Sequence, residues 1–191
     1  MREETPPVLE RAAESAIEPD LEPLLHFYGE SGQGAPRFQF IPGEEVPEPY
    51  RELLVHDRDM TPTLERFHGE RIHLRPLERE EADGKFMRMV VLTTSFSRQP
   101  VEYGAIAIHL DRFSERAQEL IRGCRTPLGT ILATEDIQHV SRPTAFFRVH
   151  SDARMEEALG LYEPWDLYGR RSALWTPEGV VLADVVEILP P

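Results

Sequence analysis

The sequence is short of cysteine, long apolar runs and positive charge, and each shortage excludes a class of protein. Cys124 is the single cysteine, so no disulfide can form within the chain and a cytoplasmic location is the default expectation. No stretch approaches the ~18 consecutive apolar residues that a membrane-spanning helix needs. We therefore expect no membrane insertion.

Basic residues are outnumbered by acidic ones. Lysine and arginine number 21 against 34 aspartate and glutamate residues, which gives a formal net charge of -13. Such a field repels nucleic acids and anionic membranes, so neither is an expected partner. An anionic ligand would have to be held by local arginines against this overall field.

Metal and cofactor motifs are also missing. The seven histidines show no H-x-x-x-H, H-E-x-x-H or Cys/His spacing, so we expect no metal site. Cys124 and the serines lie in no nucleophile-elbow context, and no glycine-rich phosphate loop is present. We therefore expect no cofactor.

The pattern of apolar residues predicts one α+β domain after a less regular start. With 191 residues, 40% of them hydrophobic, the chain can build a real core. We expect residues 1–46 to form a peripheral extension. Apolar residues at helical spacing predict helices at 9–16 and 21–28, and a short strand is expected at 38–41. From residue 71 onward the alternation predicts a mainly antiparallel sheet. The expected elements are strands near 72–77, 86–93, 101–110, 142–150 and after 179, a turn over 79–85, and helices at 114–122, from 126 and at 155–162.

Residues 53–69, LLVHDRDMTPTLERFHG, predict two helices joined by a tight acidic corner. Thr61 and Pro62 are typical of a helix start, and Gly69 of a helix end. Met60 would lie in the sharp turn. The residues alone leave two interpretations open, an ordinary helical corner and a flap that closes over a small anionic ligand.

Two charged residues interrupt apolar strands. Arg88 lies within FMRMVV and Glu187 within VVEIL. An unpaired charge there would cost several kcal/mol, so each must meet an opposite charge, water or a ligand. They could pair with each other or face solvent, or both could face one pocket, where Arg88 would bind a carboxylate.

Six segments in order resemble the chorismate pyruvate-lyase family, in particular its branch with a DRDMT-type flap signature. They are LLVHDRDMTPTLERFHG, FMRMVVL, PVEYGAIAI, TPLGTIL, LYGRRSALW and VVEILPP, which together span about residues 47–191. The resemblance implies an antiparallel sheet with helices on one side and a buried pocket under a helix-turn-helix flap. It also implies cleavage of chorismate, a dianionic acid, to 4-hydroxybenzoate and pyruvate without a cofactor.

The resemblance also implies roles for individual residues. Arg88 and Glu187 would be catalytic, Arg88 gripping a carboxylate and Glu187 meeting the ring hydroxyl or relaying a proton. A second arginine of better known members is replaced by Ala105, and Arg148, Arg75, His73 or His109 could take over its contact. The expected substrate-binding residues are Met60, Thr61, Arg88, Gly104, Leu128, Gly129 and Arg148.

Two other functions stay open. The effector-sensing domain of GntR-type regulators resembles the same fold and binds small acids without turnover. A relative acting on another chorismate-like acid is the third possibility, which Ala105 supports. The sequence leaves the choice between monomer and dimer open.

Overall fold

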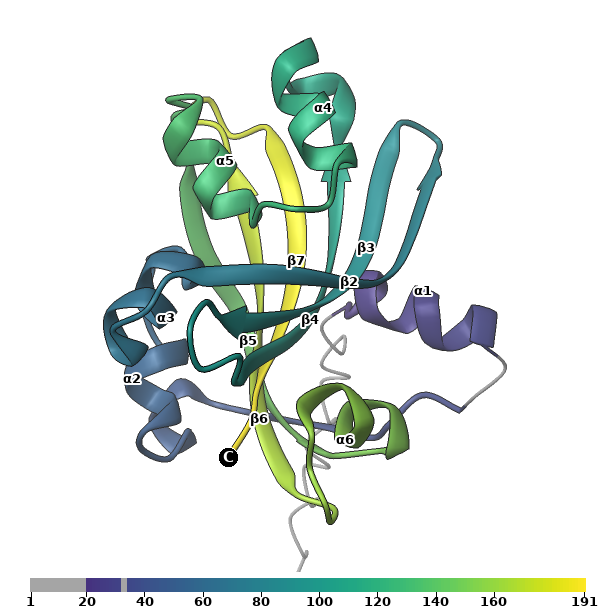
Figure 1. Ribbon diagram of the computed structural model, residues 1–191, viewed down its shortest axis with the longest axis vertical. Coiled ribbons are helices and arrows are strands. Elements are labelled where there is room, and N and C mark those ends of the chain that lie inside the picture. Colours follow the sequence, from purple (N-terminus) through teal and green to yellow (C-terminus); the bar gives the residue numbers. More distant parts are fainter. Residues whose placement is uncertain (1–19, 32–33) are drawn as a thin grey trace, which may run out of the picture.

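Seven strands form one antiparallel sheet in the order β1-β5-β6-β7-β4-β3-β2 (Figure 1). The computed structural model describes residues 20–31 and 34–191. The strands are β1 Phe38–Ile41, β2 Ile72–Ala82, β3 Lys85–Thr94, β4 Pro100–His109, β5 Val140–His150, β6 Asp166–Trp175 and β7 Val181–Leu189. The helices are α1 Glu22–Ser31, α2 Tyr50–Leu54, α3 Met60–His68, α4 Glu115–Arg122, α5 Leu128–Thr134 and α6 Ala153–Leu159, with 3-10 turns at Gly43–Glu45 and Leu110–Arg112. The expected α+β fold with an antiparallel sheet is confirmed.

Strand β3, which lies between β4 and the edge strand β2, is apolar on both faces except at Arg88, because helices cover both faces. Met87 and Met89 belong to a core cluster that includes residues of α1 and α6. Phe86 packs with residues of α4 and α5, and Val90 with residues of α2 and α3. The expected helical layer on one side is therefore formed by α2 to α5, and α1 and α6 add cover on the opposite face (Figure 1).

The N-terminal part contributes one helix and one edge strand to this arrangement. The predicted stripe near residues 21–28 is confirmed as α1, whose Leu24 and Tyr28 are buried. The predicted strand at Phe38–Ile41 is β1, which pairs with β5. The helical stripe predicted at residues 9–16 lies outside the described residues. The division of the chain at residue 46 stays a prediction.

Two predicted boundaries were wrong. The turn expected over residues 79–85 contains only Asp83 and Gly84, because both adopt positive φ, 50° and 73°, as the tightest hairpin turns require. The helix expected at 155–162 is Ala153–Leu159. Asp152 caps its start by accepting a bond from the Met155 amide, and Gly160 ends it in a left-handed conformation.

Among the described residues, no helix is long and apolar enough to cross a membrane.

Candidate functional site

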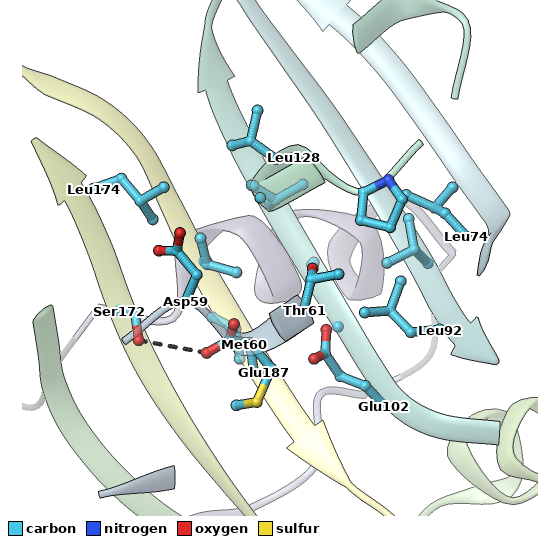
Figure 2. A pocket seen from close by; sticks show the side chains of 18 of the residues that line it. Asp59, Met60, Thr61, Leu74, Leu92, Glu102, Leu128, Ser172, Leu174 and Glu187 are labelled. Carbon is cyan, nitrogen blue, oxygen red and sulfur yellow. Dashed lines mark hydrogen bonds between the residues drawn. The ribbon is translucent and has the colours of Figure 1, made fainter. Parts of the chain in front are cut away.

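A cavity lies between the sheet and the corner that joins α2 to α3 (Figure 2). The volume of the cavity is about 70 Å³. About 10 to 15 Å³ is enough for one water, so the space suits a small organic molecule. The predicted residues Met60, Thr61, Arg88, Gly104, Leu128, Gly129 and Glu187 all line it, together with Asp59, Leu74, Val90, Leu92, Glu102, Ala105, Ile106, Pro127, Ser141, Ser172, Leu174, Val185 and Val186.

The corner over this cavity is the predicted helix-turn-helix flap. Its second helix, α3, begins at Met60 rather than at the expected Thr61-Pro62 start. The N-cap residue is Asp59, whose side chain makes no capping bond because its carboxylate contacts His139 Nε2 at 2.9 Å. Gly69 ends α3 with φ 67°, as predicted. The flap is therefore connected to the segment between α5 and β5 through Asp59.

Arg88 is a buried cation without an acidic partner among the described residues. Its side chain is 1% exposed and donates only two long bonds, from Nη1 to Ile121 O at 3.4 Å and from Nη2 to Thr126 O at 3.3 Å. Its Nε is buried without a partner. Burial lowers the pKa of Arg88. An incoming carboxylate could accept from this guanidinium and supply the missing negative charge.

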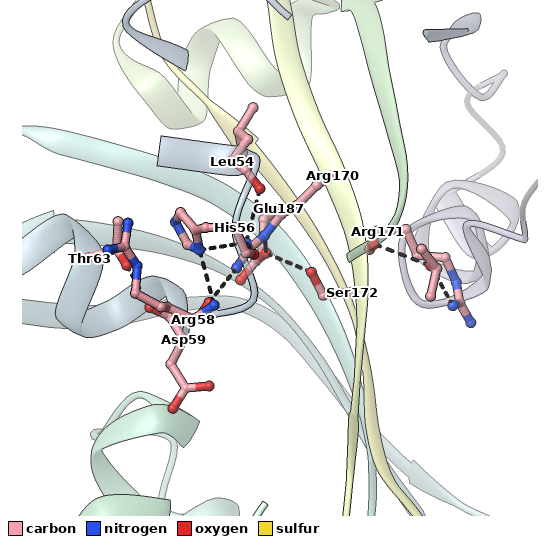
Figure 3. A network of polar contacts seen from close by, with 10 residues as sticks. Leu54, His56, Arg58, Asp59, Thr63, Arg170, Arg171, Ser172 and Glu187 are labelled. Carbon is pink, nitrogen blue, oxygen red and sulfur yellow. Dashed lines mark hydrogen bonds and ion pairs between the residues drawn. The ribbon is translucent and has the colours of Figure 1, made fainter. Parts of the chain in front are cut away.

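Glu187 does not pair with Arg88, which rules out the mutual ion pair that the sequence left open. The Glu187 carboxylate accepts from Arg170 Nε at 2.5 Å and lies 3.4 Å from the Ser172 hydroxyl, which donates to it (Figure 3). Register explains the choice of partner, because Arg170 is directly opposite Glu187 on the neighbouring strand. Both side chains are buried.

Arg170 also holds the corner of the flap (Figure 3). Its guanidinium donates to three carbonyl oxygens of the corner, Leu54 O at 3.1 Å, His56 O at 3.1 Å and Arg58 O at 3.2 Å. The buried Arg170 side chain therefore pairs with Glu187 on β7 and donates to three backbone carbonyls that accept no bond within a helix. Arg170 lies within the segment LYGRRSALW, and no role was predicted for it from the sequence.

His56 is kept neutral within this corner. Its Nδ1 accepts from the Arg58 amide at 3.1 Å and lies 3.4 Å from Arg170 Nη1. Burial, followed by the positive charges of Arg170 and Arg58, lowers the pKa of His56 from 6.5 to about 4. Protonation at Nδ1 would remove the accepted bond and place two cations side by side.

We expect acid to destabilise the fold through His56. The unfolded histidine binds a proton near pH 6.5 and the folded one near pH 4, so stability falls as the pH is lowered through this window. The loss should be on the order of 2 kcal/mol, allowing for partial solvent screening. Urea unfolding at pH 7 and pH 4 measures it. His56→Asn should remove this part of the pH dependence, whereas His73→Asn, at an exposed position, should keep it. An unchanged acid loss in His56→Asn would contradict this assignment.

Glu102 is a further buried ionisable group in the cavity, and it was not among the residues predicted from the sequence. Its side chain is 5% exposed and its Oε2 has no hydrogen-bond partner. Burial, followed by the negative charge of Glu187, raises its pKa well above the usual range, while Arg170 opposes this shift. A charge within the apolar run VEYGAIAI was the available signal. It is the same signal that identified Arg88.

No second arginine reaches the cavity in the described part of the chain. Ala105 borders the cavity, but its side chain packs in the core cluster on the α1 side, next to Met89 and on the opposite face of the sheet from Arg88. Arg148 is exposed on β5, where it donates to Gln39 at 2.8 Å. None of the four replacements considered from the sequence, Arg148, Arg75, His73 and His109, lines the cavity.

Gly104 is needed for the close pairing of strands β4 and β7 as well as for the space in the cavity. A β-carbon at this position would lie 2.7 Å from Val186 O and 3.2 Å from Glu102 Oε1. Because the first of these is a backbone atom, the strands would have to move apart to admit a side chain. At Gly129 the nearest atom, Thr61 Oγ1, would be 3.4 Å away, which is ordinary contact.

No protein-family model matches this sequence, and none of the curated proteins matches it. The structure is similar to the gene product SA0254 of Staphylococcus aureus subsp. aureus N315, with a TM-score of 0.53, 7% identity, and coverage of 72% of this chain and 90% of that chain.

Two further solved structures are described as a ligand-binding domain and an effector domain. The ligand-binding domain of a predicted GntR-family transcriptional regulator from Bordetella bronchiseptica has 12% identity and a TM-score of 0.47, over 62% of this chain and 85% of that chain. The effector domain of PhnF from Mycobacterium smegmatis has 13% identity and a TM-score of 0.49, over 69% and 87%. At such identities the similarity concerns the fold alone.

Proposed function

We propose that this chain binds a small organic acid in the cavity under the flap, with Arg88 as the group that holds its carboxylate. The single observation that carries this proposal is Arg88 itself, a buried guanidinium that lines the cavity without an acidic partner among the described residues. Burying an uncompensated cation is expensive, and a carboxylate ligand would offset that cost through charge-assisted, two-pronged bonding.

The geometry favours binding without turnover over cleavage of chorismate. Chorismate carries two carboxylates, and the cavity lining contains one arginine together with Asp59, Glu102 and Glu187. Glu187, the predicted catalytic acid, is already held by Arg170. This corresponds to the effector-type alternative, in which a small acid occupies the site and is released unchanged.

Chorismate cleavage is the second candidate, and one observation favours it. Seven positions that the resemblance to the chorismate pyruvate-lyase family assigns to the site lie around one cavity, although they come from five separate segments. In that reading Arg88 would hold one carboxylate and the cavity would fold the substrate into a reactive conformation, aromatisation supplying the driving force.

One experiment separates the two candidates. The purified protein is incubated with chorismate, and pyruvate and 4-hydroxybenzoate are followed by chromatography beside a protein-free control, because chorismate decays on its own. We expect no product above the control, together with calorimetric binding of a simple monocarboxylate. Product formation that Arg88→Met abolishes would instead establish the lyase, and absence of both turnover and acid binding would refute the proposed function.

A further inference from the structure

Four ionisable side chains line the cavity, and only two of them have a partner of opposite charge among the described residues. Asp59 is held by His139 and Glu187 by Arg170. Arg88 and Glu102 have no partner of opposite charge among the described residues, and they do not pair with each other. The empty cavity therefore contains one unmatched cationic group and one unmatched acidic group.

Register places these two groups toward opposite ends of the cavity. On the β3–β4 ladder Arg88 is opposite Ile106, whereas Glu102 is opposite Leu92, four residues further along β3. At the usual rise of a strand this offsets the two positions by about 13 Å along the strand direction. In Figure 2 Glu102 lies near Glu187, and Leu128 lies at the other end of the cavity.

We infer that the ligand is a zwitterion, an organic acid whose single carboxylate meets Arg88 and whose protonated amine meets Glu102. The inference rests on the proposed function and specifies the class of acid. Both buried groups would gain the partner that each lacks, and a ligand with one charge of each sign would leave the site neutral. A dicarboxylate would instead bring a second negative charge to the end that already holds two carboxyl groups.

The surroundings of Glu102 explain why an amine fits better than a hydroxyl. Glu187 on β7 and Arg170 on β6 face it, and the flap contributes Asp59, which is paired with His139. Burial and the neighbouring Glu187 raise the pKa of Glu102, so we take Glu102 to hold a proton while the cavity is empty. A bound ammonium would replace that proton, so binding releases it and the affinity for the amine rises with pH.

Two matched acids test this inference. 4-(Aminomethyl)benzoate carries an ammonium where 4-(hydroxymethyl)benzoate carries a neutral hydroxyl, and both have one carboxylate and the same shape. We expect the amine to bind roughly 10- to 150-fold more tightly, the range of a charge-assisted hydrogen bond. Titration calorimetry at one pH in buffers of different ionisation enthalpy should show release of close to one proton for the amine and none for the alcohol.

Substitution of Glu102 completes the test. Glu102→Gln has the shape of the neutral acid, so it should fold normally, bind both acids with similar affinity and release no proton. Glu178→Gln, an exposed change of the same overall charge, should behave like the parent. Equal affinities in the parent, or a preference for the amine that survives in Glu102→Gln, would overturn the inference and leave the proposed function intact. Failure of the parent to bind either acid would overturn the proposed function.

Discussion

Arg88→Met should weaken acid binding strongly without harming the fold. We expect the affinity for 4-(hydroxymethyl)benzoate to fall by roughly 10- to 150-fold, since a charge-assisted bond to a carboxylate contributes about 1.5 to 3 kcal/mol. The free energy of unfolding should stay the same or rise. The reason is that methionine fills a similar volume and removes a buried cation with two long bonds to carbonyl oxygens.

Two further variants sharpen this result. Arg88→Lys keeps the charge and loses the planar fork, so it should bind the acid more weakly than the parent and more tightly than Arg88→Met. Arg148→Met removes an exposed arginine that lies outside the cavity. It should change neither the affinity for the acid nor the free energy of unfolding. Calorimetric titration and urea unfolding measure both effects. Normal acid binding by a folded Arg88→Met protein would remove Arg88 from the site.

Glu187→Gln should destabilise the fold by about 3 to 5 kcal/mol, the usual cost of removing one member of a buried ion pair. The change leaves the Arg170 guanidinium buried without its counter-charge, and the same guanidinium holds the flap corner at Leu54, His56 and Arg58. Thermal and urea unfolding measure the loss.

A double variant shows whether this loss belongs to the ion pair. Adding Arg170→Met to Glu187→Gln removes the stranded charge. The double variant should therefore lose less unfolding free energy than the two single variants lose together. Recovery should be incomplete, because the three corner carbonyls lose their donor. A Glu187→Gln protein that melts like the parent would show that Glu187 is not needed as the counter-charge of Arg170.

Much of the site could be predicted because it depends on local signals. A proline and a glycine mark the limits of the flap helix, and a charge inside an apolar strand marks Arg88 and Glu187. The assignment of Met60 and Leu128 to one site with Arg88 came from the resemblance to the chorismate pyruvate-lyase family, and all three residues line the same cavity.

The choice of partners could not be predicted, because it depends on strand register. Glu187 faces Arg170 only because β6 and β7 pair in one alignment, and a shift of one residue would present Arg171 instead. Register likewise places Glu102 on the face of Leu92, in the cavity, and turns Ala105 toward the core below α1. The second layer of helices was missed because nothing local in β3 says what covers each face.

A crystal structure of the protein with 4-(aminomethyl)benzoate bound is the most direct test of the central claim. We predict that the carboxylate accepts from Arg88 Nε, the nitrogen that lacks a partner, and lies beside Leu128 and Gly129 under the flap, with the amine at Glu102. An acid bound elsewhere on the protein, with Arg88 still bonded only to the Ile121 and Thr126 carbonyls, would contradict the claim.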